Sequence, residues 1–92
     1  MATQLKTTNI QAKLSALGDA TRYKIVKLLK EQPELCVSEV AEKVGITTAG
    51  ISQHMKILEQ SGLVSPQRMG QRTCYRLQIN GRDSQALINL IK

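Results

Sequence analysis

The chain has 92 residues, with 13 Lys and Arg against 7 Asp and Glu and a formal net charge of +6. This length fits one domain with a small core, which a partner subunit would stabilise, and the positive charge favours a polyanionic partner. No apolar run exceeds three residues and the first twenty residues lack the apolar core of a signal peptide, so a membrane span is excluded and a cytoplasmic protein is predicted.

Two helices are predicted before the first proline of the chain. A loose tail is expected for residues 1–7 and a single domain for residues 8–92, which begins with a helix over residues 8–17. Asp19 is well suited to cap a second helix over residues 20–30, because its carboxylate can accept hydrogen bonds from the first turn. Three apolar residues at helical spacing mark the buried face of this helix: Ile25, Leu28 and Leu29.

The central stretch, residues 37–64, has the pattern of two short helices joined by a tight turn. Ser38 can cap the first helix, and Gly45 supplies the backbone freedom that the turn requires. Thr47 lies where the second helix should begin, and Gly62 follows its end. Residues at positions i, i+4 and i+7 of the second helix form its buried stripe: Ile51, Met55 and Leu58.

The opposite face of the second helix carries small or hydrogen-bonding side chains and little negative charge. Such a face can enter the major groove of DNA and pair with base edges, whereas a solvated helix more often mixes Glu and Lys. The residues expected to reach base edges are Thr48, Ala49, Ser52 and Gln53. His54 and Lys56 are expected at the margin of the DNA contact. His54, the only histidine, has an alternative role as a helix-surface residue that packs against its own neighbours.

After the central stretch the hydrophobic pattern changes to the alternation of β-strands. Residues 63–68 and 72–79 are predicted as the two strands of a hairpin with its tip at residues 69–71. Residues 63–82 hold four arginines and no acid. A cationic hairpin of this kind can touch phosphates or enter the minor groove, and the residues expected to do so are Arg68, Gly70 and Arg72.

The remaining elements complete the predicted fold. Residues 35–37 are too short for a helix and are predicted as a strand fragment, and a last helix is predicted over residues 82–92. The first and last helices are expected to form a dimer surface, because a terminal helix this apolar on a small domain needs a partner. The order α-α-β-α-α-β-β-α, mainly helical with a small β-hairpin wing, is that of a winged helix-turn-helix.

Three segments in this order resemble the ArsR/SmtB family of transcriptional repressors. The family's opening helix motif is similar to LGDATRYKIV at residues 17–26, and the segment that carries metal-binding cysteines in some members is similar to ELCVSEV at residues 34–40. Its recognition helix and exit resemble ISQHMKIL and SGLV within residues 51–64. The resemblance runs from about Leu14 to Leu77. It implies a homodimer that binds a double-stranded, pseudo-palindromic DNA operator and is released by a metal, an oxidant or another inducer.

The sensing site departs from the patterns of the family. Metal-sensing relatives carry two cysteines separated by one residue, whereas Cys36 has no such companion, and the last helix offers Asp83 without a histidine. A soft metal in a closed site needs about four nitrogen or sulfur ligands. Because the chain provides only Cys36, Cys74 and His54, no metal site and no cofactor is predicted, and another signal is favoured.

Cys36 and Cys74 are expected to be free thiols by default in a reducing compartment. The strand fragment that contains Cys36 should pair with the last wing strand, which would bring both cysteines to the outer face of the sheet. Arg72 and Arg76 flank Cys74 in sequence and would lower the pKa of its thiol. One hypothesis is a thiol switch in which oxidation alters the wing and releases DNA. The alternative is two unrelated cysteines that fill small spaces.

Two other classes of protein compete with a DNA-binding regulator. Catalysis is not expected, because the only histidine lies on the face predicted to meet DNA and no phosphate loop or hydrolase motif is present. The second competitor is a winged helix that serves only as a dimerising adaptor module. An adaptor would need neither the polar face of the second helix nor the wing arginines, so their presence favours DNA binding.

Overall fold

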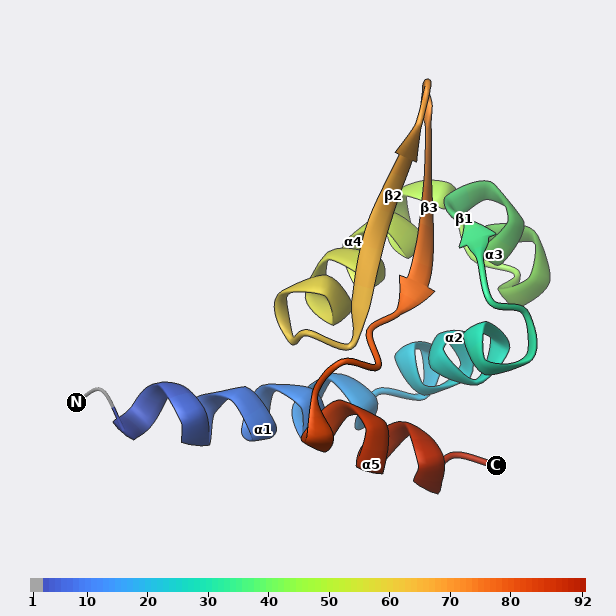
Figure 1. Ribbon diagram of the computed structural model, residues 1–92. Helices are drawn as coiled ribbons and strands as arrows, with labels where there is room; N and C mark the ends of the chain where they lie inside the picture. The colour runs from blue at the N-terminus through green and yellow to red at the C-terminus, as the bar shows by residue number, and fades with distance from the viewer. Residues whose placement is uncertain (1–2) are drawn as a thin grey trace.

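Five helices and three short strands follow one another within residues 3–92, the part of the chain that the computed structural model describes, with side chains from Ile10 onward (Figure 1). They are α1 (Thr3–Leu17), α2 (Ala20–Glu31), β1 (Leu35–Cys36), α3 (Val37–Val44), α4 (Thr48–Gln60), β2 (Val64–Met69), β3 (Arg72–Leu77) and α5 (Arg82–Leu90). The predicted fold, a mainly helical winged helix-turn-helix, is confirmed. None of the helices in this part of the chain combines the length and apolar character needed to cross a membrane.

The three strands form an antiparallel sheet in the order β1-β3-β2. Leu35 of β1 lies opposite Tyr75 of β3, so the predicted pairing of the strand fragment with the last wing strand is confirmed. Met69 pairs with Arg72, and the turn between them is therefore one residue shorter than the predicted tip. Gly70 occupies this turn with a φ of 63°, a conformation that favours glycine. Figure 1 shows the β2–β3 hairpin projecting beyond the helices as the wing.

The hydrophobic core lies among α2, α3, α4 and one face of the sheet. Its fully buried members on α4 are the predicted stripe of Ile51, Met55 and Leu58. On α2 the buried residues are Ile25, Val26 and Leu29, whereas Leu28 is only partly buried. Tyr75 and Leu35 close the core from the sheet, with their side chains on the face opposite the cysteines.

Two predicted starts of helices are wrong. Helix α1 begins at Thr3, so residues 3–7 are helical instead of a loose tail, and residues 1–2 lie outside the described part of the chain. Helix α3 begins at Val37 and its N-cap is Cys36, not Ser38. The reason is Glu39, whose Oε1 accepts a hydrogen bond from the backbone amide of Cys36 at 2.8 Å, as the third helical residue does in a capping box.

Helices α1 and α5 lie at the end of the molecule remote from the wing tip (Figure 1). Each presents a large apolar side chain to solvent: Leu14 of α1 is 53% exposed and Leu90 of α5 is 74% exposed. Ile88 of α5 and Ile91, the residue that caps its end, are instead buried in the core. The base of the molecule thus carries exposed apolar groups from both terminal helices.

Candidate nucleic-acid interface

The orientation of α4 is fixed by its first turn and by its buried stripe. The helix begins at Thr48, one residue after the predicted start, and Thr47 is its N-cap, whose Oγ1 accepts a hydrogen bond from the amide of Gly50 at 3.1 Å. Gly45 ends α3 in the left-handed conformation, with a φ of 80°, and so provides the predicted turn. Because Ile51 and Met55 point into the core, the opposite face of α4 is held toward solvent.

Five of the six residues predicted on α4 for DNA contact are exposed and lie together on this outward face. They offer hydroxyl, amide and ammonium groups and one small methyl, which are the groups that pair with base edges, thymine methyls and phosphates. These exposed residues are Thr48, Ala49, Ser52, Gln53 and Lys56. The surface is compatible with insertion into a major groove, and the individual base contacts stay a prediction.

His54 is half-buried and lies against the junction of α1 and α2. Its Nδ1 is 3.2 Å from Nη1 of Arg22 and 4.0 Å from Oδ2 of Asp19. Arg22 in turn donates from Nε to the backbone carbonyl of Ala16 at 2.9 Å. His54 therefore connects the candidate recognition helix to the first two helices. The sequence had suggested either a DNA contact or packing against neighbouring residues of its own helix, and neither hypothesis included this role.

Asp19 is the N-cap of α2 and completes this cluster. Its Oδ2 accepts a hydrogen bond from the backbone amide of Arg22 at 3.1 Å. This bond, together with the nearby charges of Arg22 and His54, holds the pKa of the Asp19 carboxyl below its usual range, although partial desolvation opposes the shift. The capping role of Asp19 was predicted, but its proximity to His54 depends on tertiary packing and has no local sequence signal.

The two wing arginines predicted to contact DNA lie on opposite faces of the hairpin. Arg68 is paired in register with Thr73, and Arg72 with Met69, so their side chains alternate. Both are exposed. Nη2 of Arg72 is 3.9 Å from Oε1 of Glu39 on α3, a pair that is largely solvated and so contributes at most about 1 kcal/mol.

Cys36 and Cys74 lie directly opposite each other in β1 and β3 and are joined by a disulfide. The prediction that both share one face of the sheet is confirmed, but the expectation of free, outward-facing thiols is wrong. Both are buried, with 7% and 0% of their surface exposed. The burial arises because α3 begins at the residue after Cys36 and packs against both strands.

Both arginines that flank Cys74 form ion pairs with carboxylates. Besides the Arg72–Glu39 pair, Nε of Arg76 donates to Oε1 of Glu34 at 2.7 Å. The carboxylates offset part of the positive charge that the sequence assigns to this part of β3. A glutamate three residues after Cys36 has the spacing of a capping box. This local signal could have predicted that the Glu39 carboxylate lies at the start of α3.

A cavity of about 210 Å³ reaches Cys36 between the first turns of α3 and α4 and the wing tip. Thr48 and Arg72, two residues of the candidate DNA surface, line it. The disulfide thus lies beside the surface that would meet DNA. Within the described part of the chain, no three His, Cys, Asp or Glu side chains gather as they would around a metal ion.

Comparison with known proteins identifies the family of this domain. The model of the arsR family of bacterial regulatory proteins matches residues 19–65, from the cap of α2 to the start of β2. The HTH-type transcriptional regulator YuzN of Bacillus subtilis strain 168 is 36% identical over 90 residues, which cover 91% of this chain and 92% of YuzN. The arsenical resistance operon repressor of Escherichia coli strain K12 is 39% identical over 61 residues, 66% of this chain and 52% of the repressor.

The structural comparison agrees. The homodimeric winged helix-turn-helix DNA-binding domain of a possible ArsR-family transcriptional regulator from Mycobacterium bovis superposes with a TM-score of 0.83 at 27% identity, over 97% of this chain and 80% of that domain. This chain spans about half the length of several of the curated relatives it matches. The chain belongs to the ArsR family of DNA-binding transcriptional regulators.

Proposed function

We propose that this protein is a homodimeric repressor that binds a pseudo-palindromic DNA operator and leaves it when Cys36 and Cys74 are oxidised to the disulfide. The single observation that carries DNA binding is the outward face of α4, polar, without acids until Glu59, and held rigidly by a buried stripe. The wing adds positive charge on both of its faces through Arg68 and Arg72. Similarity to a protein named as an operon repressor supports repression.

The homodimer is supported by the exposed apolar residues of the terminal helices and by the likeness to a homodimeric domain. Two copies related by a two-fold axis would present two α4 helices to half-sites separated by one helical turn of DNA or a multiple of it. A partner would also add core to a chain of only 92 residues.

The DNA-binding proposal is tested by fluorescence anisotropy of the reduced protein on DNA from upstream of its own gene and on a scrambled duplex, at two salt concentrations. We expect tight, salt-sensitive binding to the first duplex only. Gln53→Ala should lose affinity chiefly for the operator, because a base-edge contact carries sequence information. Arg68→Ala should weaken binding to both duplexes and reduce the salt slope by about one unit.

Two results would count against this assignment. A sequence-selective loss in Arg68→Ala would contradict the phosphate role of the wing. Absent or salt-independent binding to every duplex, including those from a selection on random DNA, would favour a dimerising adaptor instead.

The redox part of the proposal follows from what the disulfide joins. It links β3, a strand of the wing, to the residue that caps the first helix of the helix-turn-helix. On oxidation by peroxide the two thiols lose two protons and two electrons and form one S–S bond, while the peroxide is reduced to water. The bond fixes the wing relative to α3, and we expect the fixed position to fit the operator less well.

The test compares operator affinity of the reduced and oxidised protein, with a Cys36→Ser/Cys74→Ser variant as the matched control. We expect oxidation to lower affinity at least about tenfold in the parent, a coupling of about 1.4 kcal/mol, and to leave the variant unchanged. Equal affinity of both redox states of the parent would reject the switch while leaving DNA binding in place. Release by Zn, Cd or arsenite from the reduced protein would identify a different signal.

A further inference from the structure

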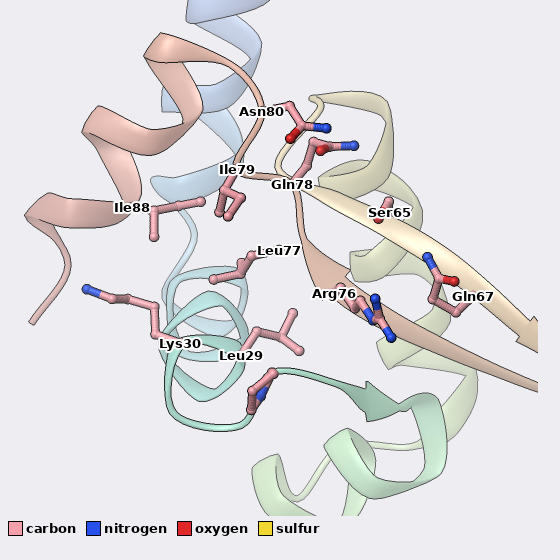
Figure 2. A pocket seen from close by; sticks show the side chains of 11 residues that line it. Leu29, Lys30, Ser65, Gln67, Arg76, Leu77, Gln78, Ile79, Asn80 and Ile88 are labelled. Atoms are coloured by element: carbon pink, nitrogen blue, oxygen red, sulfur yellow. The ribbon is translucent and has the colours of Figure 1, made fainter.

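A second cavity lies away from the cavity that reaches Cys36 and from the candidate DNA surface. It has a volume of about 530 Å³ and is open to solvent between the C-terminal half of α2, helix α5 and the outer face of β2 and β3 (Figure 2). Small-molecule sites in proteins commonly have volumes of about 300–1,000 Å³. None of the residues that line it is acidic.

One end of this cavity is polar. Arg76 of β3 lies there on the same face of the sheet as Ser65, its partner in register, and Gln67. Figure 2 shows the Arg76 guanidinium close to the Gln67 amide, with Gln78 farther along the chain. The hydrogen bond from Arg76 to Glu34 uses Nε–H, one of the five donors of a guanidinium. Arg76 thus already binds one carboxylate, through a single charge-assisted hydrogen bond.

The other end of the cavity is apolar. Leu29 of α2, Leu77 at the end of β3 and Ile88 of α5 line it. Lys30 adds its aliphatic stem, because its Nζ donates to the backbone carbonyl of Ile91 at 2.6 Å and is directed away from Arg76 in Figure 2. A ligand that fills both ends therefore needs an anionic group and an apolar body.

We propose that this cavity is a binding site for a small amphipathic carboxylic acid. The carboxylate binds the Arg76 guanidinium in competition with Glu34, the amide of Gln67 donates a further hydrogen bond, and the apolar body lies against Leu29 and Ile88. The site involves none of the residues assigned to DNA or to redox sensing, and its existence does not depend on either role.

The test titrates the ¹⁵N-labelled full chain, with its disulfide intact, with 4-phenylbutyrate, and follows its amide resonances by NMR. The controls are 4-phenylbutanamide, which lacks the charge, and acetate, which lacks the apolar body. We expect saturable shifts centred on Leu77, Gln78 and Ile88, and affinity about tenfold higher for 4-phenylbutyrate than for either control.

Variants distinguish the assigned site from general attraction to a basic protein. Arg76→Gln should weaken binding about tenfold, whereas Lys27→Gln, which removes an exposed positive charge elsewhere on α2, should not. Glu34→Gln should strengthen binding, because it removes the competing carboxylate, and a merely structural Arg76–Glu34 pair would not produce that gain. Equal affinity for the acid and its amide, shifts centred elsewhere, or unchanged affinity in Glu34→Gln would overturn the proposal.

Discussion

The imidazole of His54 joins three parts of the chain at one point. It extends from α4 to Arg22 and Asp19 at the start of α2, and Arg22 holds the last turn of α1 through the carbonyl of Ala16. A residue on the helix predicted to read DNA thus has its side chain turned toward the rest of the protein. We therefore expect the His54 side chain to contribute to the free energy of unfolding.

Arg22 and His54 are expected to act as a coupled pair. The free energies of unfolding of Arg22→Ala, His54→Ala and the double variant, measured by urea denaturation at one pH, should be non-additive by about 1 kcal/mol, since the two side chains are within hydrogen-bond distance. The matched control is Lys56→Ala, because Lys56 is exposed on the same helix as His54. The changes in the free energy of unfolding caused by Lys56→Ala and Arg22→Ala should be additive. Additivity in the Arg22–His54 cycle would show that the contact contributes nothing in solution.

Asp19 makes the free energy of unfolding depend on pH in the acid range. Its pKa is lowered in the folded state, chiefly by the hydrogen bond from the Arg22 amide, below the value of about 3.9 for an unfolded chain. The stabilisation is therefore complete above the unfolded pKa and is lost as the pH falls through the folded pKa.

Asp19→Asn and Asp19→Ser should remove this part of the pH dependence, because both retain a capping oxygen without a titratable group. Urea midpoints measured from pH 5 down to about pH 2 should fall less steeply in both variants than in the parent. Parallel curves for all three proteins would contradict the assignment.

At the scale of the element, α4 depends on its cap. Replacing Thr47 by Ala should destabilise the protein by about 1 kcal/mol, because the Gly50 amide loses the acceptor that Oγ1 provides. Thr47→Ser should keep most of the stability, and Thr48→Ala, one residue into the helix and exposed, should stay within about 0.5 kcal/mol of the parent. If Thr48→Ala destabilised the protein as much as Thr47→Ala, the assignment of the cap to Thr47 would be wrong.

The elements that could be predicted from sequence are those whose signals are local. Helix α4 has its buried stripe within its own residues and its cap at the residue directly before them, and the alternation in β3 correctly placed Tyr75 and Cys74 on opposite faces. The start of α3 was missed because two adjacent signals compete, Ser38 as a cap and Cys36 with Glu39 as a box.

The candidate site could be predicted only in part, because several of its contacts join distant residues. The exposed face of α4 follows from periodicity, but His54 meets Arg22 only after α4 has packed on the first two helices, across 32 positions of sequence. The register of β1 and β3 brought the cysteines together, yet their burial depends on α3 covering the strands.

For the whole molecule, the proposed homodimer places the two terminal helices between the copies. Leu90→Lys should convert the dimer to monomer in size-exclusion chromatography with light scattering, because a charge would be buried in an apolar interface. Met69→Lys at the wing, where the parent residue is 52% exposed, is the matched control and should remain dimeric. A dimer that survives Leu90→Lys, alone and together with Leu14→Lys, would place the interface elsewhere.

The attachment of α4 to the corner between α1 and α2 has a consequence for how DNA specificity could change. In a dimer built on the terminal helices, each α4 is joined to its own α1 through His54 and Arg22, so we expect the packing between subunits to set the distance between the two half-sites. Substitutions on the outward face of α4 would alter which bases are preferred in each half-site without changing their separation. Substitutions in the interface between subunits would alter this separation and leave the preferred bases unchanged. The base sequence of each half-site and the spacing between half-sites could therefore evolve independently.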